Sequence, residues 1–128
     1  MKFTILVTGP CYGTQNSISA FLFSKNLLKK GHTIKSIFFY SDGIYNSNIM
    51  NFPSFNEINL LKFWKKLSIK FNVKLKVCMN SCLNRGVITN NFALKKKIPF
   101  GNLDMQFEPI GFVELSKIII KSDRIIQF

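Results

Sequence analysis

The chain has 128 residues, which is enough for one hydrophobic core and too short for two domains. Its formal net charge is +12, but nearly all of the positive charge is lysine, and the arginine-rich stripes and aromatic platforms that usually bind nucleic acid are missing. No apolar stretch approaches the roughly 20 residues that span a bilayer, and the amino terminus lacks the cleavage site of a signal peptide, so we expect a cytoplasmic protein without a membrane segment.

The first half of the chain alternates between strand-like and helix-like segments. Residues 2–8 form a near-continuous apolar run, typical of a buried strand, and residues 14–30 predict a helix. Residues 33–40 are β-branched and aromatic and predict a second strand. A long polar loop is expected at residues 41–56 and a helix at residues 57–71. The apolar faces expected for the two helices comprise Ile18, Phe21, Leu22 and Leu28, and Leu60, Trp64, Leu67 and Phe71.

The second half begins and ends with strands. Residues 73–78 alternate between apolar and polar side chains, and a short polar helix should follow them. Residues 88–110 have no clear period, apart from an extended piece expected at residues 103–107. Residues 112–121 predict a helix and residues 123–128 a short strand. Strands that alternate with helices predict an α/β fold with a mainly parallel sheet and helices on both faces.

Cys78 is the most informative residue of the sequence. It ends a predicted strand, and the carboxyl ends of strands are where α/β sheets collect functional groups. A helix starting directly after Cys78 would favour its thiolate, which is the nucleophilic form. Free cysteine is also among the most buried residue types, so position alone leaves a reactive and a structural role open.

The other cysteines and the single histidine do not predict a metal site. Three cysteines give no disulfide framework, which indicates a reducing compartment. Cys82 either resolves an oxidised or persulfidated Cys78 or packs against the sheet, and we favour packing. Cys11 is either a buried filler or a second thiol. His32 is the only histidine and no paired Cys-x-x-Cys occurs, so zinc is not expected; His32 should interact with the carbonyl groups at a helix end.

The loop at residues 8–14 lies between a predicted strand and a predicted helix, where phosphates often bind. It contains neither of the glycine-rich nucleotide motifs, and Pro10 removes one N–H donor. We therefore expect no nucleotide cofactor there, and expect the loop to shape the rim beside Cys78.

Short segments spread over the whole chain form a combination more specific than any one of them. They are Thr8-Gly9-Pro10, Tyr12-Gly13-Thr14-Gln15, Ser19-Ala20-Phe21, Phe38-Phe39-Tyr40, Gly43, Tyr45-Asn46, Cys78, Leu83, Arg85-Gly86-Val87 and the ending from Asp123 to Phe128. This combination closely resembles the DsrE family, in particular the catalytic subunits of its bacterial sulfur-relay complexes. The resemblance implies a flavodoxin-like three-layer α/β sandwich that spans residues 1–128 as a single domain.

The resemblance also implies a function. It implies a sulfurtransferase that holds sulfane sulfur as a persulfide on the cysteine matching Cys78 and passes it on for 2-thiouridine formation at the tRNA wobble position. The implied partners are TusB and TusC in a heterohexamer, TusA as sulfur donor and TusE as acceptor. No role follows for Cys11 or Cys82, and the chemistry needs neither metal nor nucleotide. Positive charge from Arg85 or a lysine would favour the thiolate.

Two alternatives remain open at this point. One is a non-catalytic assembly subunit of the same fold. The other is a nucleotide- or RNA-binding module that uses the basic surface, although a separate thiolase would handle the tRNA and direct tRNA binding is therefore not favoured. The chain is small and 47% hydrophobic, which predicts that some apolar surface stays exposed. We therefore expect it to assemble with other chains.

Overall fold

A central sheet of five parallel strands organises the computed structural model, which describes all 128 residues. The strands are β1 (Lys2–Val7), β2 (Thr33–Phe39), β3 (Lys74–Cys78), β4 (Phe107–Ile110) and β5 (Arg124–Gln127). Their order across the sheet is β4-β3-β2-β1-β5. Because every strand runs in the same direction, all the carboxyl ends lie at one edge of the sheet.

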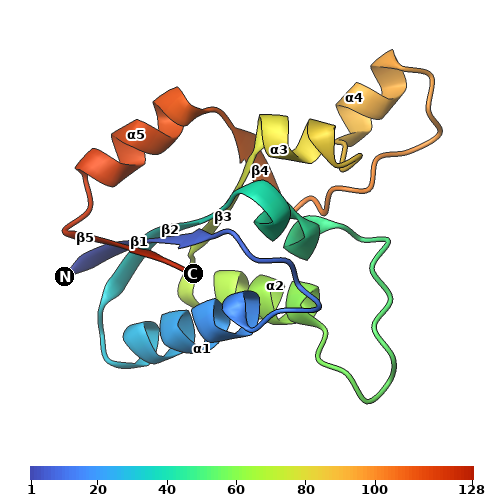
Figure 1. Ribbon diagram of the computed structural model, residues 1–128. Helices are drawn as coiled ribbons and strands as arrows, with labels where there is room; N and C mark the ends of the chain where they lie inside the picture. The colour runs from blue at the N-terminus through green and yellow to red at the C-terminus, as the bar shows by residue number, and fades with distance from the viewer.

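Helices cover both faces of this sheet, which confirms the predicted three-layer α/β fold (Figure 1). Helices α1 (Asn16–Lys29) and α2 (Leu60–Phe71) lie side by side on one face, and α5 (Phe112–Ile120) lies on the other. The chain advances from β1 to β4 toward one edge and then returns past β1 to β5. Since crossovers between parallel strands keep one hand, this reversal of direction places α5 opposite α1 and α2.

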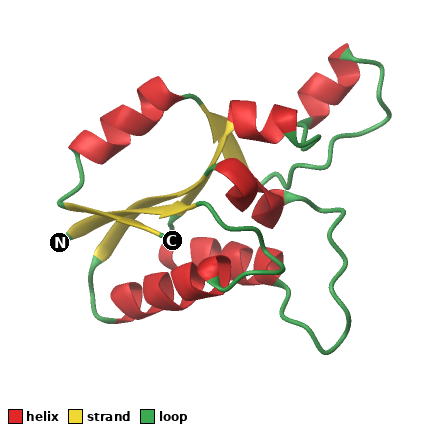
Figure 2. Cartoon of the chain, in the orientation of Figure 1, coloured by secondary structure: helices red, strands yellow, loops and turns green.

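Three short helices stand near the carboxyl edge of the sheet: η1 (Ser41–Ser47), α3 (Met79–Asn84) and α4 (Asn90–Lys95). Figure 2 shows long loops after η1 and after α4. The sequence predicted only loop at residues 41–56, but its first part is the 3-10 helix η1, with four buried residues: Gly43, Ile44, Asn46 and Ser47. None of the helices is both long and apolar enough to cross a membrane.

The core consists of two clusters separated by the sheet. The larger one lies between the sheet and helices α1 and α2, where the fully buried Trp64 meets Phe21 and Phe39 edge-on. The smaller one, under α5, comprises Phe38, Cys78, Ile110 and Leu115. The predicted apolar face of α2 is confirmed. On α1, the prediction that Leu22 belongs to the apolar face is wrong, because this side chain is 49% exposed.

Two boundaries differ from the prediction for local reasons. Helix α2 begins at Leu60, because the side chain of Asn59 accepts a hydrogen bond from the backbone N–H of Lys62 and caps the helix there. The expected extended piece at residues 103–107 is a single antiparallel bridge between Leu103 and Asn48, and β4 begins only at Phe107. As an edge strand, β4 accommodates Pro109, which has no N–H to donate.

Candidate active site

Cys78 is the last residue of β3 and is followed directly by α3, as the sequence predicted. Side chains alternate along β3, so that Leu75 and Val77 enter the larger core while Lys76 and Cys78 lie on the face covered by α5. Cys78 is only 4% exposed, and it forms part of the wall of a cavity of about 280 Å³. The thiol therefore lies at the carboxyl edge of the sheet, in the wall of this cavity.

The cavity lies where the ends of β2 and β3, helices η1 and α3, and the start of α5 meet. They contribute Tyr40 and Ser41 from the end of β2 and the start of η1, Asn80, Ser81, Asn84 and Arg85 from α3 and its end, and Phe112 from α5. The rings of Tyr40 and Phe112 meet edge-on, with their centroids 5.9 Å apart. Arg85 is the charged residue of the wall, so the cavity presents one cation together with amide and hydroxyl groups to whatever approaches Cys78.

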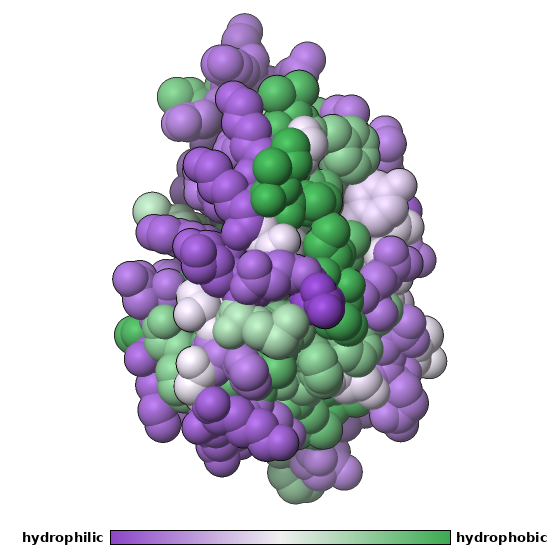
Figure 3. Space-filling view, turned by 90° about the vertical axis from the view of Figure 1, so that its left-hand side faces the viewer, coloured by the Kyte–Doolittle hydropathy of each residue, from purple (hydrophilic) through white to green (hydrophobic).

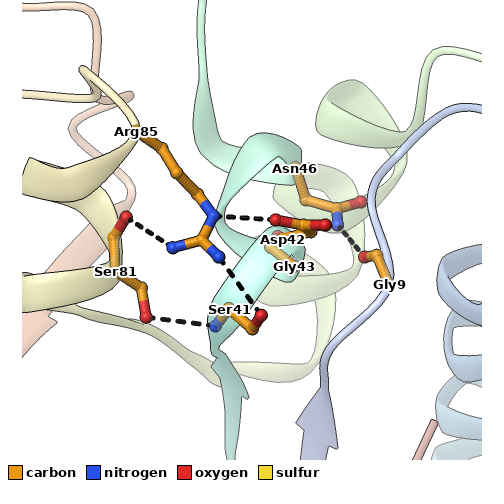
Figure 4. Close-up of polar contacts among 7 residues, drawn as sticks. All are labelled: Gly9, Ser41, Asp42, Gly43, Asn46, Ser81 and Arg85. Carbon is orange, nitrogen blue, oxygen red and sulfur yellow. Dashed lines mark hydrogen bonds and ion pairs between the residues drawn. The ribbon is translucent and has the colours of Figure 1, made fainter.

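The Arg85 guanidinium group is fixed from three directions. Its Nε donates to Oδ1 of Asp42 at 2.8 Å, while its Nη1 and Nη2 donate to the carbonyl oxygen of Ser81 and the hydroxyl of Ser41, each at 3.3 Å. Figure 4 shows the guanidinium group between Ser81 on one side and Asp42 on the other. The backbone N–H of Ser41 in turn donates to the Ser81 hydroxyl at 3.1 Å. These contacts join η1 to α3 beside the cavity.

Ser41 has a backbone φ of 52°, in the left-handed region that non-glycine residues rarely adopt. Such a conformation costs on the order of 1 kcal/mol and persists only where surrounding contacts hold it. Here the contacts with Ser81 and Arg85 hold both the backbone and the hydroxyl of Ser41. Of the three non-glycine residues with positive φ, Ser41, Asn72 and Lys97, Ser41 is the one that lies in the wall of the cavity.

A buried amide, that of Asn46, anchors η1 to the rest of the molecule. Its Nδ2 donates to Gly9, Ser17 and Gly43, and its Oδ1 accepts from Nε1 of Trp64 at 3.1 Å. The contact with Gly9 is visible at the right of Figure 4. Asn46 thus connects the loop after β1, helices α1 and α2, and the 3-10 helix that carries Ser41 and Asp42.

Lys76 lies on the same face of β3 as Cys78 and holds two carboxylates. Its Nζ is 2.6 Å from Glu108 on β4 and 3.0 Å from Glu114 on α5. Burial disfavours the charged amine, but the hydrogen bonds and charges of the two carboxylates outweigh this, so the pKa of Lys76 is raised. The cluster ties α5 to the sheet next to Cys78.

The remaining residues singled out by the sequence lie outside the cavity wall. Cys82 is buried one turn along α3, where burial, and secondarily the charge of Cys78, raise the pKa of its thiol to about 12. The Cys11 thiol donates to the Tyr45 carbonyl and accepts from Asn51 Nδ2 at 2.6 Å. Burial raises the pKa of this thiol, although hydrogen bonds from its own backbone and from Asn51 lower it in part. His32 precedes β2, at the opposite end of the sheet from Cys78, and stacks edge-on with Phe3.

The loop at residues 8–14 does not shape the rim of the Cys78 cavity, contrary to expectation. None of its residues lines that cavity, because β2 separates β1 from β3 and η1 covers the space in between. The sequence also did not reveal the roles of Tyr40 and Phe112, although the aromatic run that ends at Tyr40 was visible. The structure contains no group of three or more His, Cys, Asp or Glu side chains that could hold a metal ion.

Comparisons with known proteins show the family and the fold. The profile of the DsrE/DsrF-like family matches residues 1–128. "Sulfurtransferase TusD" of Buchnera aphidicola subsp. Acyrthosiphon pisum (strain 5A) is 49% identical, and the protein of the same name from Salmonella typhi is 38% identical, each over 100% of both chains. The crystal structure of the ychN protein from E. coli matches with a TM-score of 0.78, covering 99% of this chain and 98% of that one; at 20% identity it bears on the fold alone.

Proposed function

The chain belongs to the DsrE/DsrF-like family and is a sulfurtransferase, and we propose that it carries sulfane sulfur as a persulfide on Cys78. The single observation that carries this proposal is the position of Cys78. It ends β3 at the functional edge of the sheet, and it lines a cavity that also contains a fixed guanidinium group. No other cysteine of the chain lines that cavity.

The proposed reaction is an exchange of one sulfur atom between thiols. The Cys78 thiolate attacks the outer sulfur of a donor persulfide, the donor S–S bond breaks, and the donor leaves as a thiolate. A thiolate of the acceptor then attacks the outer sulfur of the Cys78 persulfide, and the Cys78 thiolate leaves. Each step forms one bond to sulfur and breaks another, so no external oxidant or reductant is consumed.

We further propose that the donor is TusA, that the acceptor is TusE, and that the sulfur finally serves 2-thiouridine formation at the tRNA wobble position in the cytoplasm. TusB and TusC would complete a heterohexamer. Exposed apolar side chains support assembly: Phe112, Val113 and Ile120 on α5 are 56%, 73% and 82% exposed. Figure 3 shows a continuous strip of apolar surface flanked by hydrophilic atoms on one side of the molecule.

The test is the intact mass of this chain after the assembled complex is exposed to persulfidated TusA. We expect one added sulfur atom on the wild-type chain, removable by reductant, and none on Cys78→Ser. Cys82→Ala is the matched control, because it removes a thiol one turn away that lies outside the cavity wall; this variant should still take up one sulfur. Sulfur uptake by Cys78→Ser, or none by the wild type from a competent donor, would contradict the proposal.

A further inference from the structure

The immediate surroundings of Cys78 contain several charged groups, and they differ in what they can still bind. On the α5 side, the Lys76 ammonium is occupied by Glu108 and Glu114 and is not part of the cavity wall. The neighbouring Cys82 is buried and its thiol stays neutral at physiological pH, since its pKa is raised to about 12. Arg85 remains as the cation that lines the same cavity as the Cys78 thiol.

Arg85 also retains hydrogen-bonding capacity. A guanidinium group has five N–H donors, and the contacts with Asp42, Ser81 and Ser41 use one each from Nε, Nη1 and Nη2. One donor on each terminal nitrogen is therefore free of these three contacts. Because the three contacts also fix the plane of the group, a sulfur anion in the cavity meets a cation that needs no reorientation.

The neighbouring helix α3 begins directly after Cys78, as the sequence predicted, and is short. It has only six residues, so its macrodipole is small compared with the full charge of a guanidinium group. Asp42, by contrast, opposes the effect of Arg85. Its carboxylate lies outside the cavity wall and contacts Nε of the guanidinium group at 2.8 Å, where it offsets part of the positive charge.

We propose that Arg85 stabilises the thiolate and persulfide anions of Cys78, and that Asp42 is a positioning residue that fixes Arg85 and limits its effect on the sulfur. This inference rests on the proposed function of Cys78, because it assigns the source of the charge stabilisation that a sulfur-carrying thiol needs. It predicts opposite consequences for removing the two charges. If Arg85 and Asp42 had a purely structural role, removing either charge would change the reactivity of Cys78 in the same direction.

The test is the pH dependence of Cys78 alkylation by iodoacetamide, followed at each cysteine by peptide mass spectrometry in the full complex. The rate at the alkaline plateau reports how accessible the thiol is. The pH at which the rate reaches half of that plateau, the midpoint, reports the charge around the thiol. In Arg85→Gln we expect the midpoint to rise by about one pH unit, which lowers the rate near neutral pH about tenfold. In Asp42→Asn, which keeps the Oδ1 acceptor, we expect the midpoint to fall and the neutral rate to rise.

Unchanged midpoints in both variants, or midpoints that move in the same direction, would overturn the inference. A change confined to the plateau would also overturn it, because that change reports access alone. Alkylation needs no sulfur donor, so the result stands whether or not Cys78 accepts sulfur from TusA. Conversely, if only Cys78→Ser abolishes sulfur uptake and Arg85→Gln leaves both alkylation and uptake unchanged, the relay function stands and the role of Arg85 falls.

Discussion

The Lys76 ammonium on β3 lies 3.0 Å from the Glu114 carboxylate in the first turn of α5. This ion pair reaches from the strand of Cys78 to the one helix that covers its face of the sheet. The same turn begins with Phe112, which forms part of the cavity wall. The pair therefore connects the position of α5 to the access of reagents to Cys78.

Replacing Glu114 with Gln should free the first turn of α5 while changing the unfolding free energy only slightly. The Glu114 side chain is 48% exposed, so the lost ion pair is worth less than about 1 kcal/mol of unfolding free energy. The first turn of α5 should nevertheless open more often, and the plateau rate of Cys78 alkylation should rise several-fold. Denaturant unfolding and alkylation kinetics measure the two quantities on the same sample.

Glu108→Gln is the matched control for that experiment. Glu108 contacts the same ammonium at 2.6 Å but belongs to β4, so its loss leaves the link to α5 in place. We expect a similarly small change in unfolding free energy and an unchanged plateau rate. Equal acceleration in both variants would mean that Glu114 does not restrain α5.

Gly43→Ala should displace η1 from the sheet. A Cβ atom at residue 43 would overlap the backbone carbonyl oxygen of Val7 and come within 2.8 Å of its carbonyl carbon, and backbone cannot yield as a side chain can. We expect a loss of roughly 1–3 kcal/mol in unfolding free energy, as for other overpacked sites. Because η1 carries Asp42, the Arg85 network should loosen and the midpoint of Cys78 alkylation should shift.

Gly111→Ala provides the contrast. Nothing lies within 4 Å of a Cβ built at residue 111, and its φ of −94° suits any residue. This variant should unfold within about 0.5 kcal/mol of the wild type. If both alanine variants were equally stable, the close approach of η1 to β1 would not be a constraint on the fold.

Cys82 should make the molecule less stable in alkaline solution. Its pKa is raised to about 12 in the folded chain, against an ordinary value of 9.0. The folded state therefore keeps a proton that the unfolded state releases between these values, so the unfolding free energy falls as pH rises through this window, by at most about 1.4 kcal/mol per unit. Below pH 9 the contribution is fully present.

The measurement is denaturant unfolding of wild type and Cys82→Ala at several alkaline pH values. Cys11 and Lys76 also have raised pKa values, so the informative quantity is the difference in slope between the two proteins. We expect the variant to lose stability less steeply with pH. Parallel slopes would show that the Cys82 thiol titrates alike in the folded and unfolded chains.

The sequence predicted the strand of Cys78 well, because its apolar and polar residues alternate and the two faces of the strand have different surroundings. Leu75 and Val77 face the larger core, while position 78 ends the strand at the carboxyl edge of the sheet. The predicted placement of Cys82 as a packed residue agrees with its burial. The catalytic role of Cys78 itself stays a prediction until the sulfur adduct is measured.

Two regions escaped prediction for physical reasons. Segment η1 is polar in sequence, and its burial depends on hydrogen bonds that Asn46 makes to residues far away in the chain, such as Gly9 and Trp64. Residues 88–110 include apolar side chains that stay exposed, such as Leu94 at 78% and Phe100 at 59%, so no face repeats along the segment. Arg85 was recognisable as a nearby cation, but its partner Asp42 lies 43 positions away.

The proline of β4 limits how the sheet can be extended at this edge. In a parallel edge strand, alternate residues direct their N–H groups outward, and on β4 these are Phe107, whose N–H already donates to Asp104 at 3.1 Å, and Pro109, which has none. The outer side of β4 therefore offers a visiting strand no free amide donor. A visiting strand could pair at this border only by donating to the outward carbonyl groups of β4, so extension of the sheet into a neighbouring subunit is disfavoured here.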